Sequence, residues 1–163
     1  MTPTQFETIL TKLLDDGVRY VLVGGVAGLA HGLTRATYDI DVCYWRHPDN
    51  IERLCASLAP LHPGLRVRGP ADFLLTPETV QALRDLPLET DLGAIDLMAE
   101  VAGLGDYESL LGQSQEQQLF GRPIRTLTLE ALIVAKQAAG RPQDLADVAA
   151  LEAIREFRER GDT

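Results

Sequence analysis

The sequence predicts a mixed α/β protein in which helices flank a sheet and a helical segment forms the C-terminal part. Three observations indicate this fold class. Residues 4–15 have helical spacing, residues 38–45 and 93–101 alternate as strands do, and two helical stretches follow residue 127. The chain has 163 residues, the length of about one domain. We therefore expect one domain over residues 1–163, with a sheet core over about 17–127 and C-terminal helices over about 128–160.

Each element is predicted from spacing and from residues that begin or end helices. In the first helix, Phe6, Ile9, Leu10 and Leu13 recur at intervals of three and four residues. Thr76 can cap a helix that has Pro77 in its first turn. Residues 65–67 and 73–75 are left open as short strands or loop. We expect further strands at 19–23 and on both sides of Gly121-Arg122, and further helices up to His31 and at 48–59, 106–112, 128–139 and 142–159.

Composition narrows the class of protein. The net charge of −9 and the 45% hydrophobic content are typical of a folded globular chain and exclude a disordered or collagen-like one. Residues 20–31 are too short and too rich in glycine for a membrane span, and no secretory signal is visible, so a cytoplasmic location is expected. Cys43 and Cys55 are expected to be reduced. The acidic balance disfavours binding of long nucleic acid, whereas a small anionic substrate remains compatible if a metal ion accompanies it.

Acidic side chains on two strands are the strongest indication of chemistry. Asp39 and Asp41 are two residues apart on an alternating strand, so both project from one face. Two adjacent carboxylates repel each other unless a cation or a proton joins them. Asp96 stands on the polar face of the later strand, and the three carboxylates converge if the two strands are neighbours. Such oxygens suit Mg²⁺ with a nucleotide and metal-assisted phosphoryl transfer. The alternative is an edge strand whose acids face water.

The glycine pair Gly24-Gly25 follows a strand and opens a helix. In this position, backbone N–H groups and the helix N-terminus can hold a phosphate. The pair can also serve only as a tight connection. The surrounding glycines match neither a P-loop nor the spacing of a dinucleotide-binding fingerprint, and a Rossmann domain would have no use for the paired aspartates.

Together these motifs resemble a known family. The motifs are Gly24-Gly25, His31-Gly32, Arg35-Ala-Thr37, Asp39-Ile-Asp41, Asp96 within a later strand, and Lys136 followed by Gly-Arg-Pro, Asp144 and Asp147. They resemble the nucleotidyltransferase fold of the DNA polymerase β superfamily, and within it the AbiEii-like bacterial toxin group. The resemblance spans about residues 18–151 and implies a nucleotidyltransferase-fold mixed sheet.

The resemblance implies a role for each matched residue. Gly24 and Gly25 would approach the triphosphate, and Asp39 and Asp41 would bind the metal ions. Asp96 would be the third metal-binding carboxylate and would help to activate the acceptor hydroxyl. Arg35 matches a basic position that could contact a phosphate. An arginine that is only exposed at the surface is an equally good interpretation. His31 is interpreted as a hydrogen-bonded loop histidine instead of a base.

The C-terminal block also has a physical interpretation. Lys136 continues the apolar face of its helix and is expected to point inward, where it needs a partner. In the next helix Asp144 and Asp147 are expected on the buried side, within an apolar arc of Leu145, Val148, Leu151 and Ile154. One reading is a structural ion pair between the helices. The other, implied by the resemblance, is that Lys136 contacts a nucleotide phosphate and Asp144 orients it or touches the base.

We therefore expect a Mg²⁺- or Mn²⁺-dependent nucleotidyltransferase that transfers a nucleoside monophosphate from an NTP to an acceptor hydroxyl and releases pyrophosphate. The acceptor could be tRNA, a protein side chain or a small molecule such as an aminoglycoside. The alternative is a non-catalytic nucleotide- or partner-binding module of a toxin–antitoxin-like system. Two departures favour it: Gln143 stands where relatives generally carry lysine, and the larger toxins add a target-binding domain, so a partner subunit could supply target recognition.

Overall fold

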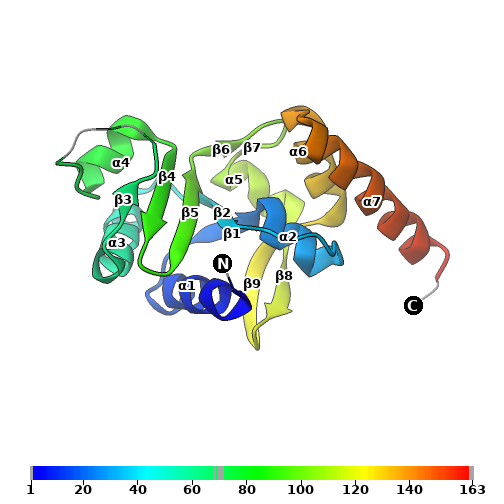
Figure 1. Cartoon of the computed structure of the whole chain (residues 1–163), viewed down its shortest axis with the longest axis horizontal. Coiled ribbons are helices and arrows are strands. Elements are labelled where there is room, and N and C mark those ends of the chain that lie inside the picture. Colours follow the sequence, from blue (N-terminus) through cyan, green and yellow to red (C-terminus); the bar gives the residue numbers. More distant parts are fainter. Residues whose placement is uncertain (1, 68, 70–71, 162–163) are drawn as a thin grey trace.

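A mixed sheet forms the centre of the molecule in the computed structural model, which describes residues 2–67, 69 and 72–161 (Figure 1). Within this part of the chain the sheet has seven strands in the order β3-β4-β5-β2-β1-β9-β8. β1 pairs antiparallel with β2, while β2 pairs parallel with β5. A separate two-stranded sheet joins β6 to β7. The strands are β1 (Tyr20–Val23), β2 (Asp39–Tyr44), β3 (Gly64–Leu65), β4 (Leu86–Thr90), β5 (Gly93–Met98), β6 (Glu100–Val101), β7 (Gly105–Asp106), β8 (Ser114–Leu119) and β9 (Arg122–Leu127).

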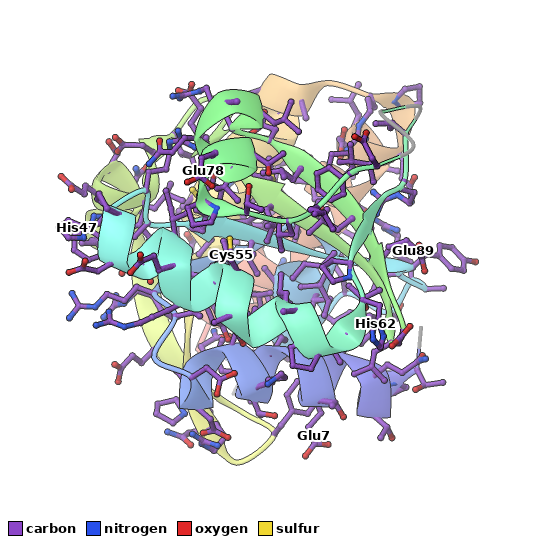
Figure 2. The ribbon with its side chains drawn as sticks, turned by 90° about the vertical axis from the view of Figure 1, so that its left-hand side faces the viewer. Glu7, His47, Cys55, His62, Glu78 and Glu89 are labelled. Atoms are coloured by element: carbon purple, nitrogen blue, oxygen red, sulfur yellow. The ribbon has the colours of Figure 1, made fainter. Side chains whose placement is uncertain are left out.

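Helices cover the sheet. The helices are α1 (Pro3–Asp15), α2 (Gly24–His31), α3 (Pro48–Leu58), α4 (Pro77–Leu83), α5 (Tyr107–Leu110), α6 (Leu129–Ala139) and α7 (Pro142–Glu159), with 3-10 turns η1 (Ala59–Leu61) and η2 (Leu111–Gln113). Figure 2 shows α1 and α3 side by side in front of the sheet, with α4 above them. α2 contacts β1 and β2 as well as α6 and α7. None of the helices in the described residues is both long and apolar enough to cross a membrane.

Side chains along strand β2 point alternately to the two faces of the sheet. Tyr44 pairs with Tyr20 across the strands, and their hydroxyls donate to the carbonyls of Arg84 (2.6 Å) and Leu10 (2.9 Å) on the face that carries α1. Ile40 and Val42 are fully buried on this face. Because strand side chains alternate, Asp39 and Asp41 point to the other face, where α2 lies. β2 lies between β5 and β1, so the edge-strand interpretation of these acids is wrong.

Most predicted elements are confirmed to within a few residues. Of the two segments left open, 65–67 has only its first residue in a strand, Gly64–Leu65, and residues 73–75 are not in a regular element. The predicted strand over 93–101 ends at Met98, because Glu100–Val101 pairs with β7 instead. The helix after β1 begins at Gly24 itself, without a separate turn.

Two features differ from the sequence interpretation. Strand β4 was not predicted, because Pro87 within it lacks the N–H that a strand donates. Pro87 lies opposite Arg66, where only its carbonyl is needed: the Arg66 N–H donates to it at 2.8 Å. Leu145, which was expected on the buried arc of α7, is 52% exposed, and the buried side is centred on Asp144, Asp147, Val148 and Leu151.

Candidate active site

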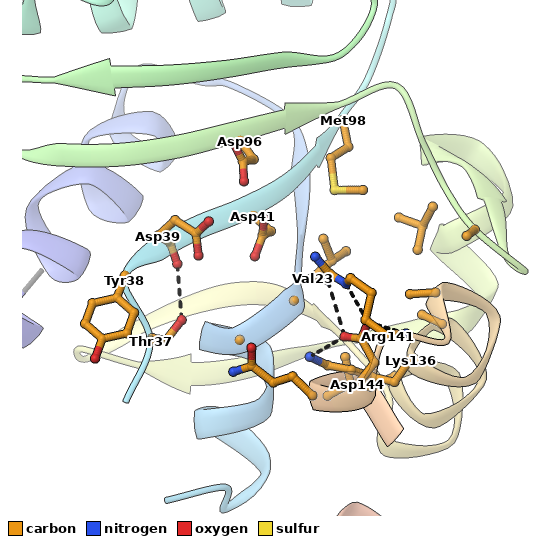
Figure 3. Close-up of a pocket in the computed structure, with 18 of the residues that line it drawn as sticks. Val23, Thr37, Tyr38, Asp39, Asp41, Asp96, Met98, Lys136, Arg141 and Asp144 are labelled. Atoms are coloured by element: carbon orange, nitrogen blue, oxygen red, sulfur yellow. Dashed lines mark hydrogen bonds and ion pairs between the residues drawn. The ribbon is translucent and has the colours of Figure 1, made fainter. Parts of the chain in front are cut away.

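Three carboxylates converge on the face of the sheet that carries α2. Asp41 and Asp96 are direct register partners on the parallel strands β2 and β5, and Asp39 lies one step away on the same face. One oxygen from each of the three lies within 4.8 Å of the others. Figure 3 shows the three side chains projecting from neighbouring strands into one opening. The sequence predicted that the three carboxylates would converge if their two strands were neighbours. The pairing of β2 with β5 meets this condition.

The electrostatics of this cluster favour a cation. Burial, together with the charges of Asp39 and Asp96, raises the pKa of Asp41 to about 7. The pKa of Asp39 is also raised, by burial and by Asp96. Three oxygen donors in this proximity suit a hard divalent cation, which would remove their repulsion. The residues therefore fit Mg²⁺ or Mn²⁺.

The N-terminus of α2 lies directly beside the acids. Gly24 has φ of +65°, a conformation that side chains rarely adopt, and a β-carbon at this position would overlap the Asp41 carboxylate. A β-carbon on Gly25 would overlap the Thr37 hydroxyl. The two glycines thus allow the backbone to approach the acids closely. The helix N-terminus, with Gly24 and Gly25 in its first turn, faces the same opening as the acids, as an anion-binding site requires.

A cluster of charged side chains forms the opposite wall. The Lys136 amine donates to Asp147 at 2.8 Å and lies 3.5 Å from Asp144. Arg35 binds both oxygens of Asp147, at 2.8 and 3.0 Å, and Arg141 donates to Asp144 at 2.7 Å. Lys136, Asp144 and Asp147 are each more than nine-tenths buried, so the inward direction predicted for all three is confirmed.

These cations hold the two buried aspartates in the charged form. Burial by itself raises the pKa of Asp144, but hydrogen bonding and charge from Arg141, with the charge of Lys136, outweigh it and the pKa falls below its usual value. For Asp147 burial is likewise outweighed, by hydrogen bonds from Arg35 and Lys136. The interhelical ion pair is therefore present. Lys136, Arg35 and Arg141 also line the cavity, so this network of ion pairs forms part of its wall.

One cavity of about 350 Å³ joins both walls (Figure 3). It is lined by all eight residues to which the sequence assigned a role: Gly24, Gly25, Arg35, Asp39, Asp41, Asp96, Lys136 and Asp144. Gln143 lines it too. The apolar part of the lining comes from β5, β6 and α6 and includes Met98, Val101, Leu132 and Ala135. His31 lies elsewhere: it is buried and its Nε2 is 2.7 Å from the Leu127 carbonyl oxygen, in agreement with a hydrogen-bonded structural role.

Sequence reasoning missed two charged residues of this site. Arg141 was visible in the Gly-Arg-Pro motif, but its side chain was given no role; it caps α7 and lines the cavity. Arg66 contacts Asp96 through its Nη2 atom. Nothing in the sequence could indicate Arg66, because its position depends on the pairing of β3 with the unpredicted strand β4.

Comparison with solved structures identifies the fold. The lincosamide antibiotic adenylyltransferase LnuA, solved with lincomycin bound, aligns over 94% of this chain and 98% of its own, at 16% identity and a TM-score of 0.66. This chain has the nucleotidyltransferase fold. ANT(2″)-Ia, in complex with adenylyl-2″-tobramycin, aligns over 97% of each chain, at 21% identity and a TM-score of 0.56. An antigenic nucleotidyltransferase-like protein from Paracoccidioides brasiliensis aligns over 91% of this chain and 74% of its own, at 18% identity and a TM-score of 0.52.

The nucleotidyltransferase fold expected from the motifs is thereby confirmed. Sequence comparison adds nothing further, since the chain matches no protein-family model and none of the curated proteins compared with it. Within the nucleotidyltransferase fold of this chain, the acids lie on the central strands β2 and β5, and the cations lie on the loop before β2, on α6 and at the N-cap of α7.

Proposed function

We propose that this chain is a Mg²⁺-dependent nucleotidyltransferase, which transfers a nucleoside monophosphate from an NTP to an acceptor hydroxyl and releases pyrophosphate. One observation carries the proposal: Asp39, Asp41 and Asp96 meet in a single cavity, opposite a wall of cations and beside a helix N-terminus. This combination provides a place for divalent cations and a place for phosphate charge in one site. The shared fold with LnuA and ANT(2″)-Ia supports it.

The acids would take separate parts in the transfer. Asp39 and Asp41 would hold the metal, with Asp96 as the third ligand. Bound Mg²⁺ supplies positive charge to the triphosphate and to the attacking oxygen. Asp96 would receive the proton of the acceptor hydroxyl as its oxygen forms a bond to the α-phosphorus. The bond from the α-phosphorus to the bridging oxygen then breaks, and pyrophosphate leaves with that electron pair.

The opposite wall would receive the triphosphate. The backbone of Gly24 and Gly25 is open to close approach, and Arg35 and Lys136 are within the same cavity. Arg141 is the most exposed cation of this wall, with 77% of its side chain accessible, and it can turn from Asp144 to a phosphate. Asp144 would then keep Lys136 in place. These groups act by positioning and by neutralising charge, which are the main sources of rate acceleration in phosphoryl transfer.

A small-molecule acceptor is favoured over tRNA. The structures of LnuA and ANT(2″)-Ia contain lincomycin and adenylyl-2″-tobramycin, which are small molecules. The net charge of −9 would oppose a long RNA, because proteins that bind long RNA through its phosphates usually need a concentrated basic surface. An amine-bearing acceptor would instead be attracted. A protein side chain remains the second candidate acceptor.

The finer assignment to the AbiEii-like toxin group is also part of the proposal. It rests on Lys136, Asp144 and Asp147, the part of the C-terminal block that lines or supports the cavity. Gln143 lines the cavity in place of the usual lysine and could supply an amide contact instead of a charge. The rival function is a nucleotide- or partner-binding module without catalysis, acting with a protein partner.

The test is a titration of the purified protein with each NTP, with and without Mg²⁺, in which melting temperature and pyrophosphate release are measured together. A ligand that binds only the folded state stabilises it by about 2.7 kcal/mol at 100 times its dissociation constant. Stabilisation that requires both Mg²⁺ and one NTP supports the proposal. Asp41→Asn should abolish it, and the exposed Asp72→Asn is the matched control.

Two other results are informative. Stabilisation by an NTP without pyrophosphate release, over a panel of amine-bearing small molecules and bulk tRNA, would favour the binding module. No response to any NTP would contradict the proposed function.

A further inference from the structure

Arg66 forms an ion pair with one of the three acids. Its Nη2 atom contacts Oδ1 of Asp96, and the two side chains are 33% and 23% exposed. The same guanidinium donates through Nη1 to the carbonyl of Leu88 at 2.9 Å, and the Arg66 backbone N–H donates to the carbonyl of Pro87 at 2.8 Å. Arg66 is therefore fixed at three points, and only one of them is a carboxylate.

The contact between Arg66 and Asp96 crosses strand β4 of the sheet. Asp96 on β5 has Pro87 as its register partner on β4, and the Arg66 backbone hydrogen-bonds to the far side of Pro87. The guanidinium thus spans the width of β4 to reach the acid.

The contact also explains how the acids can coexist without a metal. Asp41 is mostly buried beside two other carboxylates, and the cations Lys136, Arg35 and Arg141 are engaged with Asp144 and Asp147 on the other wall. Among the described residues, Arg66 is the cation that contacts a member of the acid cluster. The contact puts one positive charge against the acid cluster.

We propose that Arg66 is a positioning residue of the site: it fixes one oxygen of Asp96, leaves the other for the metal and the acceptor hydroxyl, and supplies the counter-charge that stabilises the acid cluster before metal binds. This inference rests on the proposed metal-dependent function. It predicts that the arginine and the divalent cation oppose each other electrostatically. Removing the charge should destabilise the metal-free protein and strengthen metal binding.

The test compares Arg66→Gln, Arg66→Lys and the wild type by Mn²⁺ binding, followed by the EPR signal of the free ion, and by melting temperature with and without saturating Mn²⁺. Neither measurement needs a nucleotide or an acceptor. In R66Q we expect Mn²⁺ to bind about 3–10-fold more tightly, because a unit of positive charge near the site is lost. The melting temperature should be lower without metal, and this deficit should shrink when Mn²⁺ is saturating.

Two further variants, R66K and Arg122→Gln, distinguish a positioning role of Arg66 from a merely structural one. R66K keeps the charge and should bind Mn²⁺ within about twofold of the wild type. It also provides the test if R66Q does not fold, since tighter Mn²⁺ binding by R66K would overturn the inference. Arg122→Gln removes another arginine–aspartate contact, with Asp15, outside the cavity. It should show wild-type Mn²⁺ affinity and the same melting deficit with and without the ion.

Two results would overturn the inference. The first is wild-type Mn²⁺ affinity in R66Q, and the second is a melting deficit in R66Q that Mn²⁺ does not reduce. Either would leave the proposed function intact as long as the wild type binds Mn²⁺. A wild type that binds no Mn²⁺ would contradict the proposed function itself, and the inference would fall with it.

Discussion

Gly24 lies so close to Asp41 that a β-carbon on the glycine would occupy the position of the carboxylate oxygen Oδ2. Gly24 begins α2 directly after β1, and Val23, the last residue of β1, is the register partner of Asp41 on the antiparallel strand β2. The close approach brings the first turn of α2 to the acid cluster. The glycine is therefore needed for the shape of the site as well as for its positive φ.

Gly24→Ala should disable the site and weaken the fold. The positive φ costs alanine roughly 1–2 kcal/mol, and the overlap with Asp41 adds to it. We expect the free energy of unfolding, measured by urea titration, to fall by about 2 kcal/mol or more, and Mg²⁺-dependent NTP binding to be lost. Gly112→Ala is the control, because its β-carbon would meet open space. Equal losses of stability and of NTP binding in Gly24→Ala and Gly112→Ala would contradict the close approach of Gly24 to Asp41.

Asp41→Asn should stabilise the metal-free protein, and more so at high pH. The folded-state pKa of Asp41, about 7, lies above the ordinary value of 3.8, so the folded state binds this proton more tightly than the unfolded chain. The stability that the proton contributes is present at low pH and is lost as pH rises from about 4 to 7. The asparagine avoids this loss, which is on the order of 2–4 kcal/mol.

The measurement is melting temperature from pH 4.5 to 8, without and with Mg²⁺. The advantage of D41N over the wild type should grow with pH in the absence of metal. It should shrink when Mg²⁺ is added, because the ion stabilises only the wild type. The exposed Asp72→Asn should follow the wild type throughout. If the melting temperatures of D41N and the wild type changed in parallel with pH, charge repulsion at Asp41 would not destabilise the metal-free protein.

Lys136→Met should destabilise the protein strongly, because it removes a buried amine from two buried acids. We expect a loss of about 2–4 kcal/mol at pH 7. Asp144 and Asp147 have folded-state pKa values below the ordinary one, so the stability they contribute is present above pH 3.8 and is lost as pH falls through those lowered values. The deficit of Lys136→Met should therefore shrink toward pH 3.

Lys12→Met is the matched control for that variant. Lys12 forms an ion pair with Asp16 at 3.0 Å, but both side chains are about a third exposed, so the loss should stay below about 1 kcal/mol. Urea titration at several pH values measures both. Equal losses at the two positions would mean that the interhelical pair contributes no more than a surface one.

Asn50→Ala should cost stability without affecting metal binding. Asn50 is fully buried, accepts the Arg19 N–H at 2.7 Å, and donates to the carbonyls of Arg19 and Trp45. Alanine leaves these backbone groups unpaired, at a cost of about 3 kcal/mol in the free energy of unfolding. The exposed Gln118→Ala should change it by less than about 0.5 kcal/mol. Altered Mn²⁺ affinity in N50A would contradict a purely structural role.

The alternating strands were predictable because one buried face imposes a period of two. This pattern, together with the acids that interrupt it, was sufficient to select Asp39, Asp41 and Asp96 as candidates. Lys136 could be predicted to point inward from its place on an apolar helix face, and it does. In contrast, Leu145 was expected on the buried arc of α7 but is 52% exposed: the buried side is centred on Asp144, and the next residue along a helix is turned by about 100° from it.

The residue types of the site and the local elements that carry them could be predicted from the amino-acid sequence, since both depend on short-range spacing, capping and alternation. Which elements meet depends on long-range packing. The parallel pairing of β2 with β5 joins Asp41 to Asp96, and β4, hidden in the sequence by Pro87, brings Arg66 to the same acid. Contacts between residues 30 or 55 positions apart depend on the packing of the whole chain, and no local pattern records them.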